Sequence, residues 1–117
     1  MGRLTTHVLD TSAGLPGRGI AVLLTRLDGE VRVVVAEAVT NTDGRCDTPL
    51  LAGDAMRPGV YEVSFAAGDY FAARGVALPE PKFLDVVVIR FGIAAGDQHY
   101  HVPLLISPFG YSTYRGS

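Results

Sequence analysis

The sequence predicts an antiparallel β-sandwich with one short helix. Apolar and polar residues alternate in short runs, and turn residues separate these runs at regular intervals. Hydrophobic residues make up 48% of the 117 positions and charged residues 19%. Several short strands at such spacing, in a chain of globular composition, indicate a two-layer β fold. The length and the absence of an internal repeat or linker predict a single domain over residues 1–117.

The first half of the chain contains three predicted strands, over residues 4–10, 20–27 and 31–40. Asp28-Gly29 joins the last two as a hairpin, because glycine readily adopts the positive φ that a two-residue turn requires. Asn41 to Gly44 form another turn, so Arg45 follows directly after a tight bend. Residues 49–56 lack a clear period and are interpreted as a loop.

The second half contains the helix and the remaining strands. Apolar and polar residues alternate from Tyr61 to Ala66, which is typical of a half-buried strand. Asp69 is expected to cap the N-terminus of a short helix that runs to Arg74 and stops at Gly75. Three further strands are predicted over residues 83–93, 98–106 and 109–116.

Strand periodicity places two histidines on one outward surface. Side chains alternate between the faces of a strand, so the even positions from 100 to 106, which are all apolar, face the core. The residues that then face outward are His99, His101, Pro103 and Leu105. On the first strand His7 shares a face with Thr5 and Leu9, so it can join this surface. An outward apolar face beside histidines indicates a surface where two subunits meet and enclose His101.

Both ends of the chain carry recognisable motifs. Leu4 to Asp10 reads Leu-Thr-Thr-His-Val-Leu-Asp and is followed by Gly-Leu-Pro-Gly at residues 14–17. His99 to Leu105 reads His-Tyr-His-Val-Pro-Leu-Leu, and the last four residues are Tyr114-Arg115-Gly116-Ser117. Two shorter motifs lie between them, Asp43-Gly44-Arg45 and Gly68-Asp69-Tyr70-Phe71. Together these motifs resemble those of the 5-hydroxyisourate hydrolases, the transthyretin-related enzymes of urate breakdown.

This resemblance implies a fold, an assembly and a reaction. The fold is expected to be a transthyretin-like sandwich of two four-stranded sheets with one short helix. The assembly is expected to be a homotetramer, a dimer of dimers, with active sites between the dimers. The reaction is the hydrolysis of the 5-hydroxyisourate lactam to 2-oxo-4-hydroxy-4-carboxy-5-ureidoimidazoline. The family's catalytic positions correspond to His7, Arg45, His101 and Ser117, and Tyr114 and Arg115 are expected to bind substrate.

These residue types suit lactam hydrolysis. An imidazole has an ordinary pKa of about 6.5, so two histidines can divide the roles of base and acid near neutral pH. Which of His7 and His101 is the base stays open at this point. Arg45 suits an anionic purine derivative and a developing oxyanion. The chain is expected to end at Ser117, whose hydroxyl and carboxylate could position a histidine or the water. We expect neither metal nor cofactor, because two histidines and an arginine make a poor zinc site.

Composition excludes several other classes of function. The net charge is −2 and no long basic run occurs, so neither nucleic acid nor an anionic membrane is an expected partner. No apolar segment is long enough to span a bilayer, and richness in alanine, glycine and arginine favours a bacterial cytoplasm. The single cysteine, Cys46, is interpreted as a small buried hydrophobe. His99 is interpreted as a surface residue, and Asp10, Asp69 and Tyr70 as structural. Two alternatives stay open: a small-molecule carrier that uses the same channel, and an inert interaction module.

Overall fold

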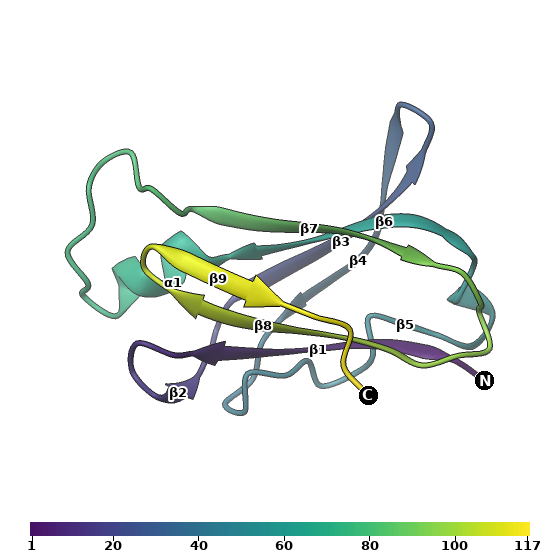
Figure 1. Ribbon diagram of the computed structural model, residues 1–117, viewed down its shortest axis with the longest axis horizontal. Helices are drawn as coiled ribbons and strands as arrows, with labels where there is room; N and C mark the ends of the chain where they lie inside the picture. The colour runs from purple at the N-terminus through teal and green to yellow at the C-terminus, as the bar shows by residue number, and fades with distance from the viewer.

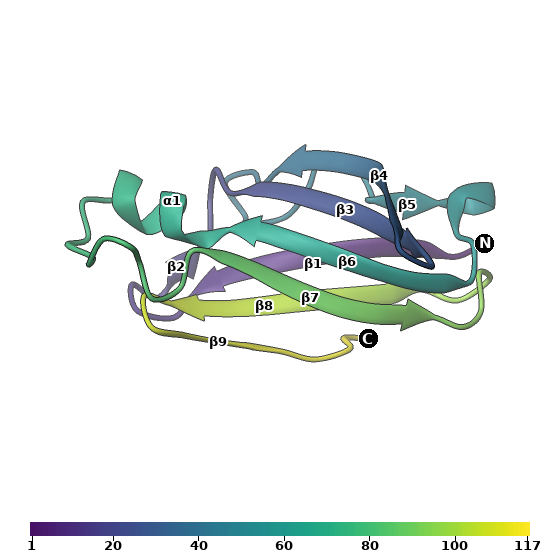
Figure 2. The same ribbon diagram turned by 90° about the horizontal axis from the view of Figure 1, so that it is seen from above.

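The computed structural model describes all 117 residues as two packed β-sheets with one α-helix (Figures 1 and 2). The first sheet has the order β2-β1-β8-β9, with β5 paired to β1, and the second has the order β4-β3-β6-β7. The first sheet contains β1 (Arg3–Asp10), β2 (Leu15–Pro16), β5 (Leu51–Ala52), β8 (Tyr100–Ser107) and β9 (Gly110–Thr113). The second contains β3 (Ala21–Asp28), β4 (Val31–Val39), β6 (Gly59–Ala66) and β7 (Val86–Ile93).

The predicted sandwich is confirmed, and one strand pair differs from it. β1 and β8 run parallel, with Thr5 beside His101 and His7 beside Pro103, so the first sheet is mixed rather than antiparallel. The second sheet has four strands as predicted, whereas the first has five, because the two-residue strands β2 and β5 both pair with β1 in addition to β8 and β9. β5 and a short 3₁₀ helix, Gly53–Ala55, lie in the segment that was interpreted as a loop.

The hairpin and the helix show where local rules succeed and fail. The predicted hairpin is confirmed, with Gly29 at φ 63°, but Asp28 still belongs to β3 and the two loop residues are Gly29 and Glu30. The helix α1 spans Ala67–Ala73, so Asp69 lies in its first turn and the prediction that it caps the helix is wrong. Asp69 still lies close to the positive end of the helix dipole. Gly75, with φ 81°, follows the helix end as expected.

β7 begins at Val86, three residues later than predicted. Just before β7, the backbone carbonyl of Asp85 accepts a hydrogen bond of 2.8 Å from the N–H of Gly68 in α1 instead of pairing within the sheet. The segment before Val86 is therefore held by the helix rather than by the sheet.

The core lies between the two sheets and contains 20 buried apolar residues. β1, β3, β6 and β8 contribute alternate residues to it, for example Val8, Leu24, Phe65 and Leu104, all without exposed surface. This alternation leaves the opposite face of each sheet to solvent or partners. No helix in the structure is long and apolar enough to cross a membrane.

A buried carboxylate joins the helix to the first sheet. Asp10 at the end of β1 accepts hydrogen bonds from the Ser12 hydroxyl at 2.6 Å and the Tyr70 hydroxyl at 2.8 Å, and also from the N–H groups of Ser12 and Ala13. Burial acts to raise the pKa of Asp10, but these hydrogen bonds outweigh it and the pKa is lowered. Asp10 and Tyr70 therefore serve packing rather than chemistry.

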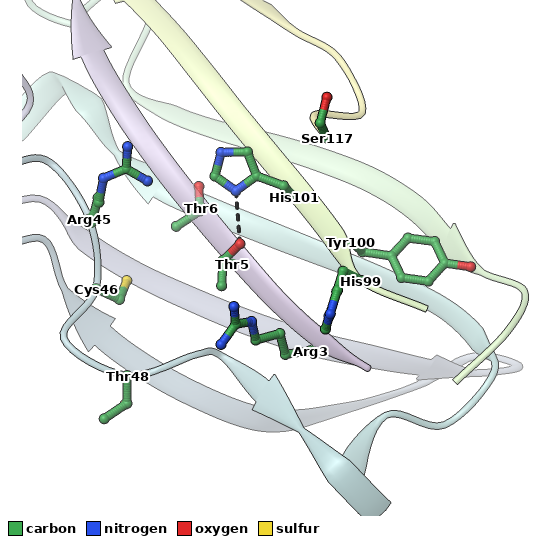
Figure 3. A pocket seen from close by; sticks show the side chains of 10 residues that line it. All are labelled: Arg3, Thr5, Thr6, Arg45, Cys46, Thr48, His99, Tyr100, His101 and Ser117. Carbon is green, nitrogen blue, oxygen red and sulfur yellow. Dashed lines mark hydrogen bonds between the residues drawn. The ribbon is translucent and has the colours of Figure 1, made fainter. Parts of the chain in front are cut away.

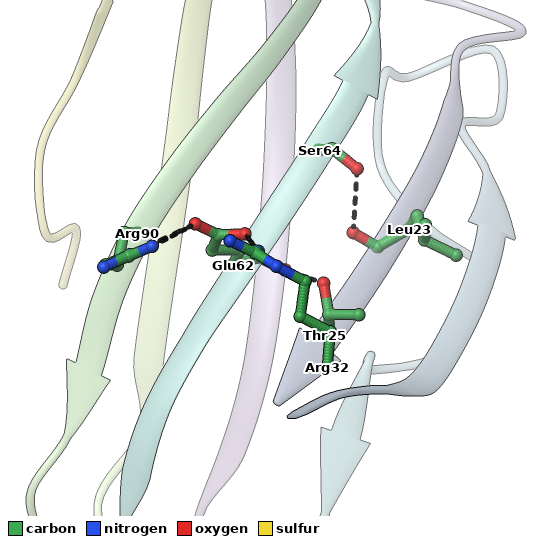
Figure 4. A network of polar contacts seen from close by, with 6 residues as sticks. All are labelled: Leu23, Thr25, Arg32, Glu62, Ser64 and Arg90. Carbon is green, nitrogen blue, oxygen red and sulfur yellow. Dashed lines mark hydrogen bonds and ion pairs between the residues drawn. The ribbon is translucent and has the colours of Figure 1, made fainter. Parts of the chain in front are cut away.

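An ion-pair network crosses the outer face of the second sheet (Figure 4). Glu62 of β6 accepts hydrogen bonds from Arg90 of β7, with Nη2 at 3.0 Å from Oε2, and from Arg32 of β4. The hydrogen bond from Arg90 is the largest cause that lowers the pKa of Glu62. The network fastens strands of the sheet opposite the histidines and takes no part in the site described next.

Candidate active site

A polar cavity of about 480 Å³ opens on the outer face of the first sheet (Figure 3). Its walls come from β1, from the start of β8, from the loop after β4 and from the end of the chain. The lining residues are Arg3, Thr5, Thr6, Arg45, Cys46, Thr48, His99, Tyr100, His101 and Ser117. Two arginines and no acidic side chain line the cavity, so its field favours an anionic ligand.

The parallel pairing of β1 and β8 brings the predicted histidines to one face. Thr5 stands beside His101 and His7 beside Pro103, so His7 and His101 are diagonal neighbours across the strand pair. The shared outward face predicted for them is confirmed by this register. Pro103 lies on this face by strand alternation, although it is buried. β8 is flanked by both β1 and β9, and this enclosure removes the small proline ring from solvent.

His101 is held by a hydroxyl group of the neighbouring strand. Thr5 Oγ1 lies 2.8 Å from His101 Nδ1, so the other ring nitrogen, Nε2, is left for a ligand (Figure 3). Burial is the main cause that lowers the pKa of His101 from its ordinary value of 6.5, and the positive charges of Arg45 and His7 lower it further. Near neutral pH the His101 imidazole is therefore predominantly neutral and can accept a proton.

His7 is oriented by the loop that follows β4. Its Nε2 lies 2.8 Å from the backbone carbonyl oxygen of Asp43. A carbonyl oxygen only accepts, so Nε2 donates and carries the hydrogen. His7 does not line the cavity, but its charge acts on His101 and its backbone forms a bridge to Arg45. The structure thus places His7 behind the cavity wall, next to both other groups.

The turn predicted at residues 41–44 positions Arg45. Asn41 Oδ1 accepts hydrogen bonds from the N–H groups of Asp43 and Arg45, at 2.9 and 3.1 Å. Gly44 has φ 76°, and its carbonyl accepts a 2.8 Å hydrogen bond from the N–H of Val8. A Cβ at Gly44 would collide with the Val8 carbonyl oxygen, so only glycine lets the loop approach β1 this closely. This docking brings the Arg45 side chain to the cavity.

The end of the chain lies directly against His101. The N–H of Gly116 donates a 2.7 Å hydrogen bond to the His101 carbonyl, and a Cβ added to Gly116 would lie 2.5 Å from Cδ2 of the imidazole. Ser117 follows and reaches the cavity (Figure 3). The structure therefore brings Arg45, His101 and Ser117 to one cavity, with His7 adjacent.

Tyr114 and Arg115 lie apart from this cavity. They line a separate hollow of about 340 Å³, together with Ile89 and Phe91 of β7. Tyr114 is 62% exposed. Within one chain, neither side chain faces the space next to His101, so the substrate contacts that the motif implies are not formed there.

Several lining residues were not singled out from the sequence. Arg3 could have been found, because strand alternation places it on the face of His7, where Thr5 was already expected. Cys46, predicted to be a buried hydrophobe, is half-buried, packs against the core and also lines the cavity. Burial raises the pKa of its thiol, and the charge of Asp47 adds to this rise. No group of three or more His, Cys, Asp or Glu side chains is arranged to hold a metal ion.

The fold and the site define a class of small β-sandwich proteins with a histidine- and arginine-lined cavity on the outer face of one sheet. Residues 4–116 match the model of the HIUase/Transthyretin family, and the chain belongs to this family.

Known proteins agree with this assignment. The chain is 64% identical over 117 residues to a 5-hydroxyisourate hydrolase of Pseudomonas aeruginosa, covering all of this chain and 93% of that protein. The solved structure of Klebsiella pneumoniae 5-hydroxyisourate hydrolase matches the full length of both chains, with a TM-score of 0.82 and 37% identity. A crystal structure of (S)-allantoin synthase matches with a TM-score of 0.93 and 48% identity. This chain spans 44% of the length of that synthase chain.

Proposed function

We propose that this protein hydrolyses 5-hydroxyisourate to 2-oxo-4-hydroxy-4-carboxy-5-ureidoimidazoline, a step of urate degradation. The observation that carries the proposal is the His101 imidazole, held by Thr5 in the same cavity as Arg45, which no acidic side chain lines. The identity of the substrate is inferred from the relatives named 5-hydroxyisourate hydrolase. A cationic cavity suits this substrate, because an anionic purine derivative is attracted by fixed arginine charges.

In the mechanism we propose, His101 is the general base. Its Nε2 takes a proton from a water molecule, and the water oxygen attacks the lactam carbonyl carbon. Arg45 stabilises the negative charge that develops on the carbonyl oxygen. The carbon–nitrogen bond then breaks, the carbon becomes a carboxyl group, and the nitrogen leaves with the proton that His101 took from the water. Water is thus added across one bond and no electrons are gained or lost.

The remaining site residues orient these groups. His7 does not line the cavity and has an orienting role: its Nε2 is fixed by the Asp43 carbonyl, and its backbone forms a bridge to Arg45. The Ser117 hydroxyl positions the water at the mouth of the cavity. Tyr114 remains a proposed substrate contact. Because it lies outside the cavity of its own chain, this contact requires that Tyr114 face the substrate in the site of a second subunit.

The reaction is expected to proceed without added metal. 5-Hydroxyisourate is generated from urate with urate oxidase, and its absorbance decay is followed with and without the purified protein. We expect faster decay with the protein and no change on adding a chelator, because no metal ligand set is present. A chelator that abolishes activity, with recovery on adding zinc, would contradict this. Binding of the substrate without faster decay would instead support a carrier.

We also propose that the working assembly is a homotetramer, a dimer of dimers. The cavity opens on a sheet face that also presents Leu105, half-buried, and Leu9, 38% exposed. An interface there would shield the cavity from water and strengthen its charge interactions. Sedimentation at assay concentration should give a tetramer, and Leu105→Glu should dissociate it and reduce activity. An active monomer would rule out a site completed between subunits.

A further inference from the structure

We propose that Arg115 is a positioning residue: it clamps the end of the chain onto β8 so that Gly116 and Ser117 stay against His101. Arg115 then acts on the reaction through the chain end rather than by contact with substrate. The kinetic part of this inference rests on the proposed function, whereas its structural part does not.

The clamp is needed because the pairing between β8 and β9 is interrupted. Leu104 pairs with Thr113, and the same register returns when His101 meets Gly116, so Tyr114 stands opposite Pro103. Proline has no N–H and cannot donate to the partner strand. The Pro103 carbonyl accepts a hydrogen bond of 2.7 Å from the Thr113 hydroxyl. β9 accordingly ends at Thr113, and the residues after it require another attachment.

Arg115 provides that attachment through three contacts, one with Tyr100 at the start of β8 and two with the residues just before it. Its guanidinium carbon lies 4.1 Å from the centre of the Tyr100 ring, a distance typical of a cation–π contact. Its Nη2 donates to the backbone carbonyl of His99 at 3.0 Å and to Gln98 Oε1 at 3.3 Å. None of the five ion pairs in the chain includes Arg115. Its charge is thus directed to an aromatic ring and a carbonyl group rather than to a carboxylate.

The platform under Arg115 is itself fixed. Tyr100 is only 6% exposed, and its hydroxyl accepts hydrogen bonds from the N–H groups of Ala94 and Ala95, at 3.0 and 3.1 Å. An aromatic ring anchored at both ends cannot follow a mobile chain end. Arg115 therefore fixes the chain end relative to the core, through its contact with the buried Tyr100 ring.

The clamp reaches His101 through the next residue. Gly116 follows Arg115 directly, donates to the His101 carbonyl and packs on the imidazole. Arg115 does not line the cavity that contains His101 and Arg45. Releasing Arg115 should therefore uncover the His101 ring and displace Ser117 while leaving the other walls in place.

Two substitutions separate a clamp from a substrate contact. Arg115→Lys keeps the charge but loses the planar group that stacks and forks, and Arg115→Ala removes both. We expect each variant to lower kcat by roughly tenfold or more, with KM changed much less, because misplaced catalytic groups slow the chemical step. Arg57→Lys and Arg57→Ala, at an exposed arginine outside the cavity and the chain end, are the matched controls. If alanine mainly raises KM and lysine restores it, Arg115 binds substrate and the clamp is wrong.

A second measurement does not depend on activity. The titration of His101 is followed by NMR in the wild type and in both Arg115 variants. Burial is the largest cause of the lowered pKa of His101, so release of the chain end should raise this pKa in both variants alike. An unchanged titration in both would overturn the clamp, and a rise with alanine but not lysine would assign Arg115 a purely electrostatic effect. Failure of the wild type to hydrolyse 5-hydroxyisourate would refute the proposed function, while this titration would still test the clamp.

Discussion

Replacement of His101 by alanine is expected to lower kcat by on the order of a hundredfold or more, the range for a positioned base. His101 is the half-buried imidazole whose pKa is lowered and whose Nε2 is left for a ligand. His7→Ala should cause a comparable loss, because it removes the imidazole that the Asp43 carbonyl fixes and whose charge acts on His101. Both are measured as the decay of 5-hydroxyisourate at saturating substrate.

His99 supplies the matched control for this experiment. It lines the same cavity but is exposed, two residues before His101 and just outside β8. His99→Ala should lose far less activity than His101→Ala, with the fold of each variant checked by circular dichroism. Equal losses at His99 and His101 would show that the wrong imidazole has been assigned as the base.

The pH dependence of activity shows whether His101 acts as a base or as an acid. A base must be neutral in the free enzyme, so activity should fall as the pH drops through the pKa of His101. Because this pKa is lowered from 6.5, the acid limb of kcat/KM should have its inflection below 6.5. If activity instead falls as the pH rises through this inflection, His101 acts as an acid and His7 takes the role of base.

Gly116→Ala is expected to reduce kcat/KM by roughly ten- to a hundredfold while the fold remains intact. The new Cβ would lie 2.5 Å from Cδ2 of His101, which is closer than real contacts allow. Either the imidazole turns away from Thr5 or the chain end lifts and carries Ser117 with it. A displacement of about 1 Å in a catalytic group is enough for a loss of this size. Deletion of Gly116 and Ser117 should have a similar effect.

Gly110→Ala is the control for Gly116→Ala. Both glycines are half-buried, neither has a positive φ, and each stands opposite a residue of β8. A Cβ at Gly110 would lie 3.6 Å from Ser107 Oγ, an ordinary contact, so this variant should keep full activity. If Gly116→Ala is as active as Gly110→Ala, the close approach to His101 has no catalytic importance.

The local part of the site was accessible from the sequence. Alternation along a strand is a property of the backbone, so it placed His101, His7 and Thr5 on outward faces without knowledge of their partners. The turn at Asn41 to Gly44 was equally clear, because its hydrogen bonds and its positive φ lie within five residues.

The contacts between distant segments were not accessible. The hydrogen bond between Thr5 and His101 joins residues 96 positions apart and depends on parallel pairing, which no local pattern encodes. The contacts of Arg115 with Tyr100 and His99 could not be predicted either, because they join two separate segments of the chain. They lie where Pro103, on the neighbouring strand, has no N–H to pair with the chain end. The motif identifies Arg115 as important, and only the three-dimensional arrangement separates a clamp from a substrate contact.

The pairing of β1 with β8 has a consequence for the order of folding. The second sheet is built from strands that are close in sequence and can pair as soon as residues 21–93 are available. β1 emerges first during synthesis and can pair early with the short strands β2 and β5, but its parallel partner β8 comes almost last, since 96 residues separate Thr5 from His101. Contacts of such long range form slowly. We therefore expect β structure to be recovered before hydrolysis during refolding. The time at which activity appears should then report when β1 pairs with β8 in the first sheet.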